Sequence, residues 1–174
     1  MSIKHILTEP DPILRKKCEP FQQVDKSVQK LMKDMEETMY KAPGIGLAAV
    51  QIGILKRVVV IDISKDDGKK NPLFFVNPKI IYKSENTSTY EEGCLSLPGQ
   101  FAEIERPAEC LVKYLDFYGK EKQLKADGLM ATCIQHEVDH LDGILFIDYL
   151  SKLKKTMIIK KLKKQKNSIE RIVV

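Results

Sequence analysis

The stretch Gln135-His136-Glu137-Val138-Asp139-His140 constrains this chain more than any other, because its two histidines are four residues apart. Residues four apart on a helix lie about 40° apart around the axis and about 6 Å apart along it, so both imidazole rings can converge on one ion. Glu137 can then reach a water molecule bound to that ion. The alternative is a charged helical turn without a metal. The chain holds only three histidines and two of them lie here, which favours the metal site.

The sequence around the histidine pair predicts a buried helix. Asp127 is a candidate N-cap, and Asp142-Gly143 is a stop signal. Between them, apolar residues recur at three- and four-residue steps on more than one face: Leu129, Met130, Cys133, Ile134, Val138 and Leu141. We therefore expect this helix to lie in the middle of the protein rather than on its surface.

A catalytic metal also needs a third protein ligand, and no His or Glu follows at the downstream spacing usual in metalloproteases. Upstream, Cys94 is the only cysteine that has a glycine before it and a Leu-Ser-Leu-Pro-Gly turn after it. Gly93 should let the backbone come close to the helix, and a thiolate binds late divalent metals strongly. Cys94, His136 and His140 would leave one position for water, as in a hydrolytic site.

The length and composition indicate one soluble globular domain. A chain of 174 residues with 43% hydrophobic and 30% charged residues can build an ordinary core, and we expect residues 1–150 to form a single catalytic domain. No apolar run could span a membrane and no signal-peptide core is present, which predicts a cytoplasmic protein. The cysteines show no C-x-x-C pairing, so we expect no disulfides and interpret Cys18 and Cys110 as core residues.

Charge is divided unevenly along the chain. Residues 151–174 hold eight Lys, one Arg and one Glu, a local charge of 9 − 1 = +8, so the remaining 150 residues carry 5 − 8 = −3. Apolar residues alternate with the lysines at helical spacing (Leu153, Met157, Ile158, Leu162 and Ile169), which predicts a basic amphipathic helix with its apolar face docked on the body. Such asymmetry points to a polyanionic partner, or merely to a solvated helix.

The remaining patterns predict an α+β fold. A helix should open near 25–27, bury Val28, Met32 and Met35, and stop at Pro43-Gly44. Strands are expected at 57–63, 74–76, 80–82, 87–90, 109–115 and 120–125, with a turn at Asp66-Asp67-Gly68 and a bulge or edge at Asn77-Pro78. We expect mainly antiparallel strands packed around the central helix, with one helix near each terminus and the last beginning near residue 148.

The stretch from Gly44 to Gln51 formally fits G-x-G-x-x-A, a dinucleotide-binding pattern. That pattern requires a strand before it and a helix after it, and here the order is reversed. The glycines instead indicate backbone that passes close to a bound peptide or a catalytic group. Gln51 offers a side-chain amide at the end of this stretch.

Three segments together resemble the motifs of the peptide deformylases of the short bacterial type. They are Gly44 to Gln51, Glu92-Gly93-Cys94-Leu95-Ser96 and the histidine stretch from Gln135 to His140, in the family's order and at its spacing. The resemblance extends over essentially the whole chain. It implies removal of the N-formyl group from the initiator methionine of new polypeptides, with release of formate.

The resemblance also implies roles for individual residues. Cys94, His136 and His140 match the metal ligands, and Glu137 matches the general acid/base. Gln51 and the backbone N–H of Leu95 match the groups that hold the oxyanion. Positions near the methionine pocket and peptide backbone are matched by Ile45, Gly46, Gly93, Leu129 and Cys133. The chain departs from the pattern at Phe101, where many bacterial members have a basic residue, and at Thr132, which replaces an aliphatic residue.

The family resemblance implies one divalent ion and two partners. The ion would be Fe²⁺ in the cell, although simple affinity ordering favours zinc, and Zn²⁺, Ni²⁺ or Co²⁺ can substitute. The partners would be N-formylmethionyl nascent peptides and, through the basic tail, the ribosome near its exit tunnel. No membrane and no sequence-specific DNA are expected.

Two other functions fit parts of the sequence. A zinc endopeptidase would also use the two histidines and Glu137, but it needs a different third ligand. A non-enzymatic RNA-binding module with a structural metal would use the basic tail, but it leaves Glu137 and Gln51 without a purpose.

Overall fold

The computed structural model of the chain describes residues 2–64 and 69–172, with the side chains of the last helix described as far as residue 165. Helices and strands follow one another as α1 (Lys26–Lys41), β1 (Gly46–Ala48), β2 (Val58–Ile61), β3 (Leu73–Lys83), β4 (Thr87–Gly93), β5 (Phe101–Pro107), β6 (Glu109–Leu115), β7 (Glu121–Asp127), α2 (Gly128–Leu141) and α3 (Lys152–Ile172). Short 3-10 helices occupy Pro12–Arg15, Ala49–Ile52 and Phe146–Tyr149. The predicted turn at Asp66–Gly68 lies outside the described residues.

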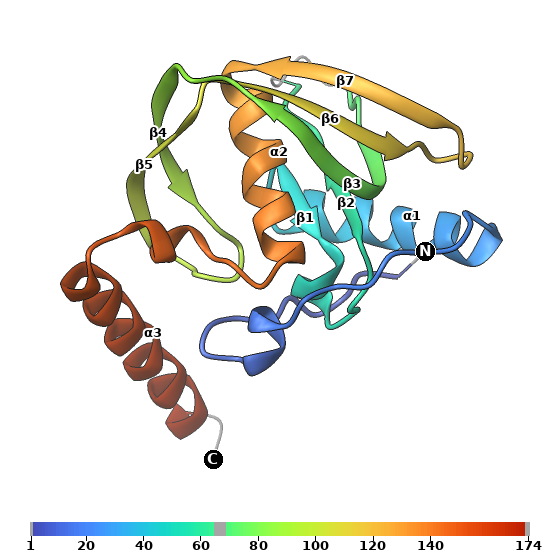
Figure 1. The fold of residues 1–174 in the computed structure, drawn as a ribbon. Coiled ribbons are helices and arrows are strands. Elements are labelled where there is room, and N and C mark those ends of the chain that lie inside the picture. Colours follow the sequence, from blue (N-terminus) through green and yellow to red (C-terminus); the bar gives the residue numbers. More distant parts are fainter. Residues whose placement is uncertain (1, 65–68, 173–174) are drawn as a thin grey trace.

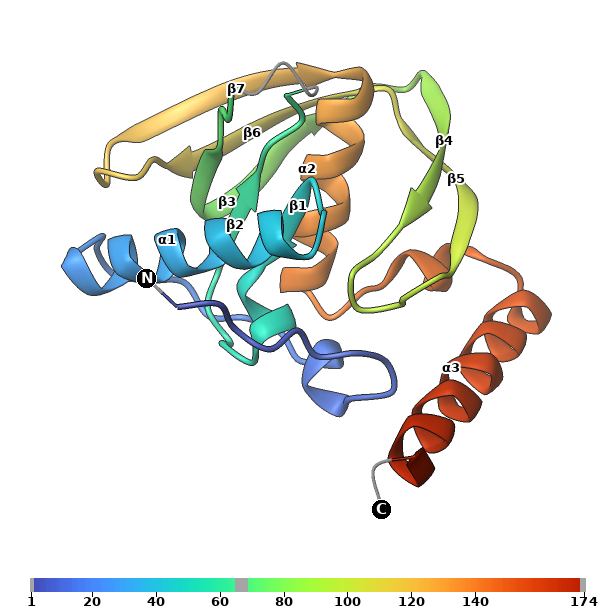
Figure 2. The same cartoon turned by 180° about the vertical axis from the view of Figure 1, so that it is seen from behind.

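The strands form two antiparallel sheets, and α2 stands between them (Figure 1). One sheet has five strands in the order β1-β2-β3-β6-β7, and the other is the β4–β5 pair. Helix α1 packs on the opposite side of the five-stranded sheet, against β1 and β2 (Figure 2). The expected α+β architecture around a central helix is confirmed.

Strand β2 shows how the core is divided. Its residues are all buried, and alternate side chains point to opposite faces. Val59 and Ile61 pack with Ile134 of α2, whereas Val58 and Val60 pack with the methionines of α1. A strand covered on both faces needs a continuous apolar run, which is what Val58–Ile61 provides.

Helix α1 begins and ends where the sequence indicates. The side chain of Asp25 accepts hydrogen bonds from the backbone N–H groups of Ser27 and Val28, which caps the first turn. Met32, Met35 and Met39 are fully buried, so the methionine stripe is core. Cys18 and Cys110 are buried as expected.

Helix α2 is buried along most of its length, as predicted, but its first turn is not capped as expected. Asp127 occupies the N-cap position as predicted, but its side chain makes no capping hydrogen bond. The stop at Asp142-Gly143 is confirmed. Gly143 has φ +75° and lies so close to the Arg15 carbonyl oxygen that an added Cβ would be 2.4 Å from it. Only glycine fits there.

Strands β3, β4, β6 and β7 fall where sequence patterns place them, and the register of β3 against β6 shifts between Val76 and Lys79, at Asn77-Pro78. Strand β5 was not predicted. It pairs with β4 so that Gly93 lies opposite Phe101. This pair matters because β4 leads directly into Cys94.

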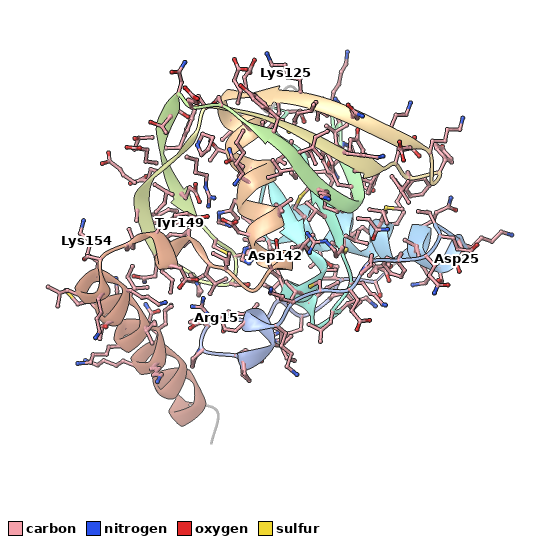
Figure 3. The ribbon with its side chains drawn as sticks, in the orientation of Figure 1. Arg15, Asp25, Lys125, Asp142, Tyr149 and Lys154 are labelled. Atoms are coloured by element: carbon pink, nitrogen blue, oxygen red, sulfur yellow. The ribbon has the colours of Figure 1, made fainter. Side chains whose placement is uncertain are left out.

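The C-terminal helix differs from expectation in two respects. Residues 146–149 form a 3-10 helix, and α3 begins at Lys152 rather than near 148. Leu153 and Met157 are 71% and 62% exposed, so they do not form the docked face; Leu162 does, packed in a cluster with Leu97 and Phe146. Ile158 borders the same cluster, Ile169 lies outside the described side chains, and Lys154 lies on the outer side of α3 (Figure 3). None of the described helices is long and apolar enough to cross a membrane.

Candidate metal centre and active site

Three side chains that can bind a metal meet where the end of β4 faces α2. Cys94 follows β4, and His136 and His140 are one turn apart on α2. Their ligand atoms all lie within 4.8 Å of one another, and the Sγ of Cys94 is 3.2 Å from the Nε2 of His140. Among the described residues, this is the only group of this kind. A thiolate and two imidazoles at this spacing fit one four-coordinate divalent ion with a position left open.

The two histidines differ in what holds each ring in a form that can bind a metal. The Nδ1 of His136 is 2.8 Å from Glu92 Oε2, so the ring donates its Nδ1–H to the carboxylate and turns Nε2 toward the other two donors. His140 is almost fully buried, and its Nδ1 has no hydrogen-bond partner among the described residues. Burial lowers the pKa of His140 well below its ordinary value, so its imidazole is neutral and has a lone pair for a metal.

Glu92 is itself held by a buried arginine. The Nε and Nη2 of Arg106 donate to the two carboxylate oxygens of Glu92 at 2.5 and 3.0 Å. Burial alone would raise the pKa of Glu92, but the hydrogen bonds from His136 and Arg106 lower it below its ordinary value. The carboxylate is therefore ionised at neutral pH and fixes the tautomer and orientation of His136.

Arg106 is held in turn by two more residues. Its Nη1 donates to Asp139 Oδ2 at 2.7 Å, and the Tyr149 hydroxyl donates to the same oxygen at 2.8 Å. The Tyr149 ring lies 4.7 Å from the guanidinium carbon, a cation–π contact. Sequence reasoning assigned no role to Glu92, Arg106 or Tyr149. The available signal was the pair of adjacent glutamates before Gly93.

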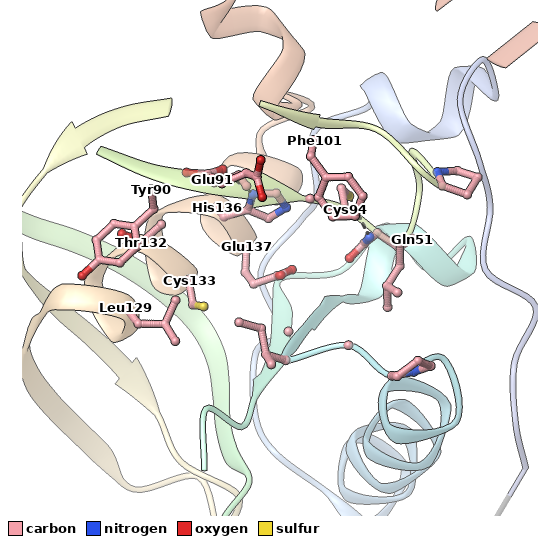
Figure 4. Close-up of a pocket in the computed structure, with 18 of the residues that line it drawn as sticks. Gln51, Tyr90, Glu91, Cys94, Phe101, Leu129, Thr132, Cys133, His136 and Glu137 are labelled. Carbon is pink, nitrogen blue, oxygen red and sulfur yellow. Dashed lines mark hydrogen bonds and ion pairs between the residues drawn. The ribbon is translucent and has the colours of Figure 1, made fainter. Parts of the chain in front are cut away.

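Glu137 points into the same space from α2 (Figure 4). It is 5% exposed, and its Oε2 has no hydrogen-bond partner among the described residues. Burial raises the pKa of its carboxyl group to about 7. Gly46 borders this carboxylate so closely that an added Cβ would be 2.4 Å from Oε1. The glycine-rich stretch thus passes close to an acidic side chain, as the sequence indicated.

Gln51 contacts the cysteine, and Leu95 follows it in the chain. The side chain of Gln51 lies beside Cys94 (Figure 4), with Nε2 3.5 Å from Sγ. The same nitrogen donates a hydrogen bond to Ser96 Oγ. The backbone N–H of Leu95 makes no hydrogen bond within the described part of the chain. Two N–H donors therefore stand beside the three metal-binding side chains, where an oxygen atom carrying negative charge would be stabilised.

A cavity of about 410 Å³ opens beside these groups. Ile45, Leu129 and Cys133 line it, as do Gly46 and Gly93, so the structure brings together every residue assigned to substrate binding. Burial first of all raises the pKa of the Cys133 thiol to about 12, which keeps it protonated. Thr132 also lines the cavity, and its hydroxyl donates to the Gly128 carbonyl.

The position of Gly93 corrects one prediction. An added Cβ there would be 2.5 Å from the ring of Phe101, its partner across the β4–β5 pair. The glycine therefore makes room for an aromatic ring at the cavity mouth rather than for α2. Phe101 is 64% exposed and covers the bare backbone of Gly93, as aromatic residues do for glycines in other sheets.

Comparison with known proteins decides the family. The family profile described as polypeptide deformylase matches residues 3–156. The chain belongs to the polypeptide deformylase family. A peptide deformylase of Pelagibacter ubique is 64% identical over 174 residues, covering all of both chains, and one of Rhizobium meliloti is 54% identical over 164 residues, covering 94% of each.

Solved structures agree. The crystal structure of the peptide deformylase from Ehrlichia chaffeensis has a TM-score of 0.92 and 41% identity, covering 96% of this chain and 98% of that one. The same enzyme in complex with actinonin has a TM-score of 0.90 and 44% identity, covering 95% and 98%. As a deformylase, the chain is a metal-binding hydrolase that removes the formyl group from N-terminal formyl-methionine of new polypeptides and releases formate. The zinc endopeptidase alternative receives no support.

Proposed function

We propose that Cys94, His136 and His140 are the only protein ligands of the deformylase metal. The observation that carries this is the approach of their three donor atoms to within 4.8 Å. Beside them is Glu137, whose Oε2 has no hydrogen-bond partner among the described residues. A divalent ion held there would act as a Lewis acid and lower the pKa of a water molecule at the open position. Glu92 would keep Nε2 of His136 directed at the ion.

We further propose that the ion in the cell is Fe²⁺, with Zn²⁺, Ni²⁺ or Co²⁺ able to replace it. Thiolate and imidazole donors suit all four ions, so the proposal depends on family resemblance rather than on donor type. The test is metal analysis of protein purified without oxygen, together with formate release after chelation and reloading with each ion. Iron should give the highest kcat; a higher kcat with zinc would contradict the proposal.

Glu137 is the proton carrier in this proposal. Its carboxylate takes a proton from the attacking water as the water oxygen bonds to the formyl carbon. The same proton then passes to the leaving nitrogen as the C–N bond breaks, giving formate and a free amine. A pKa raised to about 7 by burial suits a group that must accept and return a proton near neutral pH.

The oxyanion formed on the formyl oxygen would be stabilised by two donors of the chain. These are the Nε2–H of Gln51 and the backbone N–H of Leu95, which flank Cys94. Removal of one such donor in other enzymes lowers kcat roughly 10²–10³-fold. Gln51→Ala should therefore lower kcat by about that factor while metal content stays unchanged.

The methionine side chain would occupy the cavity lined by Ile45, Leu129 and Cys133, with Gly46 and Gly93 against the peptide backbone. An apolar pocket discriminates by only about 1–3 kcal/mol per methylene, so formyl-norleucine peptides should be nearly as good as formyl-Met peptides. Formyl-Asp peptides should be poor, because the carboxylate would lose its water without gaining a partner. Equal kcat/KM for formyl-Met and formyl-Asp peptides would refute the pocket.

The activity itself is tested by formate release from a formyl-Met peptide, with the same peptide lacking the formyl group as the control for endopeptidase cleavage. We expect formate from the first and no internal cleavage of either. Glu137→Gln is the matched variant, because the amide keeps the volume of the side chain and removes its capacity to accept a proton.

We also propose that α3 binds the ribosome, where the substrates emerge, and that the enzyme therefore acts in the cytoplasm. The support is the local charge of +8 after residue 150 and the exposed lysines on the helix, which suit a polyanionic RNA surface. Residues 1–150 would then suffice for chemistry. Because Leu162 is buried, truncation at residue 160 would also remove core packing, so point variants give the cleaner test.

The point variants neutralise exposed lysines without touching Leu162. Lys160, Lys161 and Lys163 changed to Gln should weaken co-sedimentation with ribosomes and reduce the slope of its salt dependence by about one for each phosphate group that a lysine no longer neutralises. Turnover of a short free peptide should be unchanged. Lys69, Lys120 and Lys122 changed to Gln remove the same charge elsewhere and are the control. Equal weakening in both variants would show that only net charge matters.

A further inference from the structure

The side-chain amide of Gln51 is held at both of its ends. The backbone N–H of Ala48 donates to Oε1 at 2.8 Å. Because a backbone N–H can only donate, the oxygen end of the amide must face Ala48, and the NH₂ end must face the other way. Nε2 is then 3.1 Å from Ser96 Oγ and 3.5 Å from Cys94 Sγ.

Ser96 takes one of the two Nε2 hydrogens and leaves the other directed toward the cysteine. Ser96 is 0% exposed and Gln51 is 1% exposed, so their hydrogen bond lies away from solvent. The terminal torsion of a glutamine has broad minima and does not set the amide plane by itself. The Ser96 hydroxyl therefore decides, with Ala48, which way the remaining N–H points.

The backbones of the same two residues are joined by the N-terminal segment 7–9. The N–H of Leu7 donates to the Gln51 carbonyl at 2.7 Å, and the N–H of Glu9 donates to the Ser96 carbonyl at 2.9 Å. These two bonds fix the segment that carries Gln51 relative to the segment that carries Leu95 and Ser96. The backbone segments that carry the two N–H donors are thus fixed relative to one another, and the hydrogen bond to Ser96 orients the side-chain donor of Gln51.

We propose that Ser96 is a positioning residue for formyl hydrolysis: its hydroxyl holds the Gln51 amide so that one Nε2–H faces the reacting oxygen. Ser96 itself touches neither the substrate nor the metal in this arrangement. The inference rests on the proposed role of Gln51 as an oxyanion donor. It predicts an effect of Ser96 that exists only while Gln51 is present.

The test is a double-mutant cycle on the full-length, iron-loaded enzyme, with Ser96→Ala, Gln51→Ala and the combination. Ser96→Ala removes one buried hydrogen bond and should lower kcat about two- to tenfold, with KM within about twofold and metal content unchanged. In the Gln51→Ala background, Ser96→Ala should change kcat by less than about twofold, because the group that it positions is gone.

A matched pair of variants separates the hydroxyl from packing at this fully buried site. Ser96→Thr and Ser96→Val have the same shape and differ by the hydroxyl, so both carry any penalty of an added methyl group. The Thr variant should have the higher kcat by the same two- to tenfold. In zinc-loaded protein, the Gln51 side-chain NH₂ resonances should shift in the Val variant relative to the Thr variant. This pair also carries the test if Ser96→Ala does not fold.

Each result has a defined meaning. A full Ser96→Ala effect in the Gln51→Ala background, or equal kcat for the Thr and Val variants, would overturn the positioning role. Loss of kcat with Gln51→Ala but not with Ser96→Ala would overturn it too, while leaving the proposed function intact. If Gln51→Ala itself left kcat unchanged, the proposed oxyanion donor would be wrong.

Discussion

Adding a single methyl group at Gly46 should displace the proposed general base. The Cβ of an alanine there would be 2.4 Å from Glu137 Oε1, 2.9 Å from its Cδ and 3.1 Å from its Cγ. Gly46 is not among the glycines with positive φ, so alanine can adopt its backbone conformation and only the contact matters. The backbone of β1 is paired with β2 and cannot easily move, so the flexible carboxylate must move instead.

The distance by which the Glu137 carboxylate must move determines the expected loss of kcat. Ordinary contacts of a Cβ begin at 3.4 Å, so the carboxylate must retreat by about 1 Å. A displacement of about 1 Å in a catalytic group can cost about 10²-fold in rate, equivalent to about 2.7 kcal/mol of barrier. We therefore expect Gly46→Ala to lower kcat for formate release about 100-fold while the protein retains its metal.

Two controls separate displacement from general damage. Gly99→Ala adds a methyl group at the cavity rim, where no atom lies within 4 Å, and its φ of +68° should affect stability rather than kcat. In a Glu137→Gln background, Gly46→Ala should cause little further loss. A kcat within about threefold of the parent enzyme for Gly46→Ala alone would refute the reasoning.

The other predictions concern the network and the pH dependence of stability. Glu137→Gln should retain metal, measured by elemental analysis, and lose at least about 100-fold in formate release; near-normal turnover would rule out Glu137 as the base. Arg106→Met leaves Glu92 and Asp139 without their buried partner and should destabilise the fold by about 3–5 kcal/mol in urea denaturation, whereas a loss below about 1 kcal/mol would mean that these carboxylates find other partners. The hydrogen bond from Lys30, followed by that from the Ser2 N–H, holds the pKa of Asp34 well below its ordinary value of 3.8 despite burial. The ionised Asp34 therefore contributes fully to the free energy of unfolding above pH 3.8, and this contribution is lost as the pH falls through the lower pKa that Asp34 has in the folded protein. Asp34→Asn should accordingly be less stable than the parent at pH 7, and the gap should shrink below pH 3.8; a gap independent of pH would contradict the ion pairs.

The parts of the site that the sequence predicted are those encoded over short distances. The spacing of His136 and His140 on a helix follows from local geometry alone, and Cys94 stands out by its immediate neighbours. That these three residues meet in space could be predicted only with the help of the family motifs. Cys94 and His140 are 46 positions apart, with three strands and most of α2 between them.

The parts that were missed depend on contacts between distant segments. Strand β5 buries Ile104 and Arg106 on one face. An arginine in the sequence is normally taken as an exposed position, so Phe101–Pro107 does not show the alternation of apolar and polar residues that predicts a strand. The bond between Arg106 and Glu92 exists only in the register that pairs β4 with β5. In α3, the spacing of apolar residues predicts a helix but does not select Leu162 rather than Leu153 as the residue that docks.

The two edges of the five-stranded sheet differ in a way that suits an enzyme surrounded by unfolded chains. A bare strand edge adds extended polypeptide indiscriminately. Strand β7, the long edge, carries Glu121, Lys122 and Lys125, all exposed, and so discourages pairing along its length. Strand β1, the other edge, is three residues long and begins at Gly46, which lines the cavity. If the peptide backbone binds at Gly46 as proposed, extended substrate would pair with the short edge beside Glu137, whereas the charged side chains of β7 disfavour pairing along the long edge.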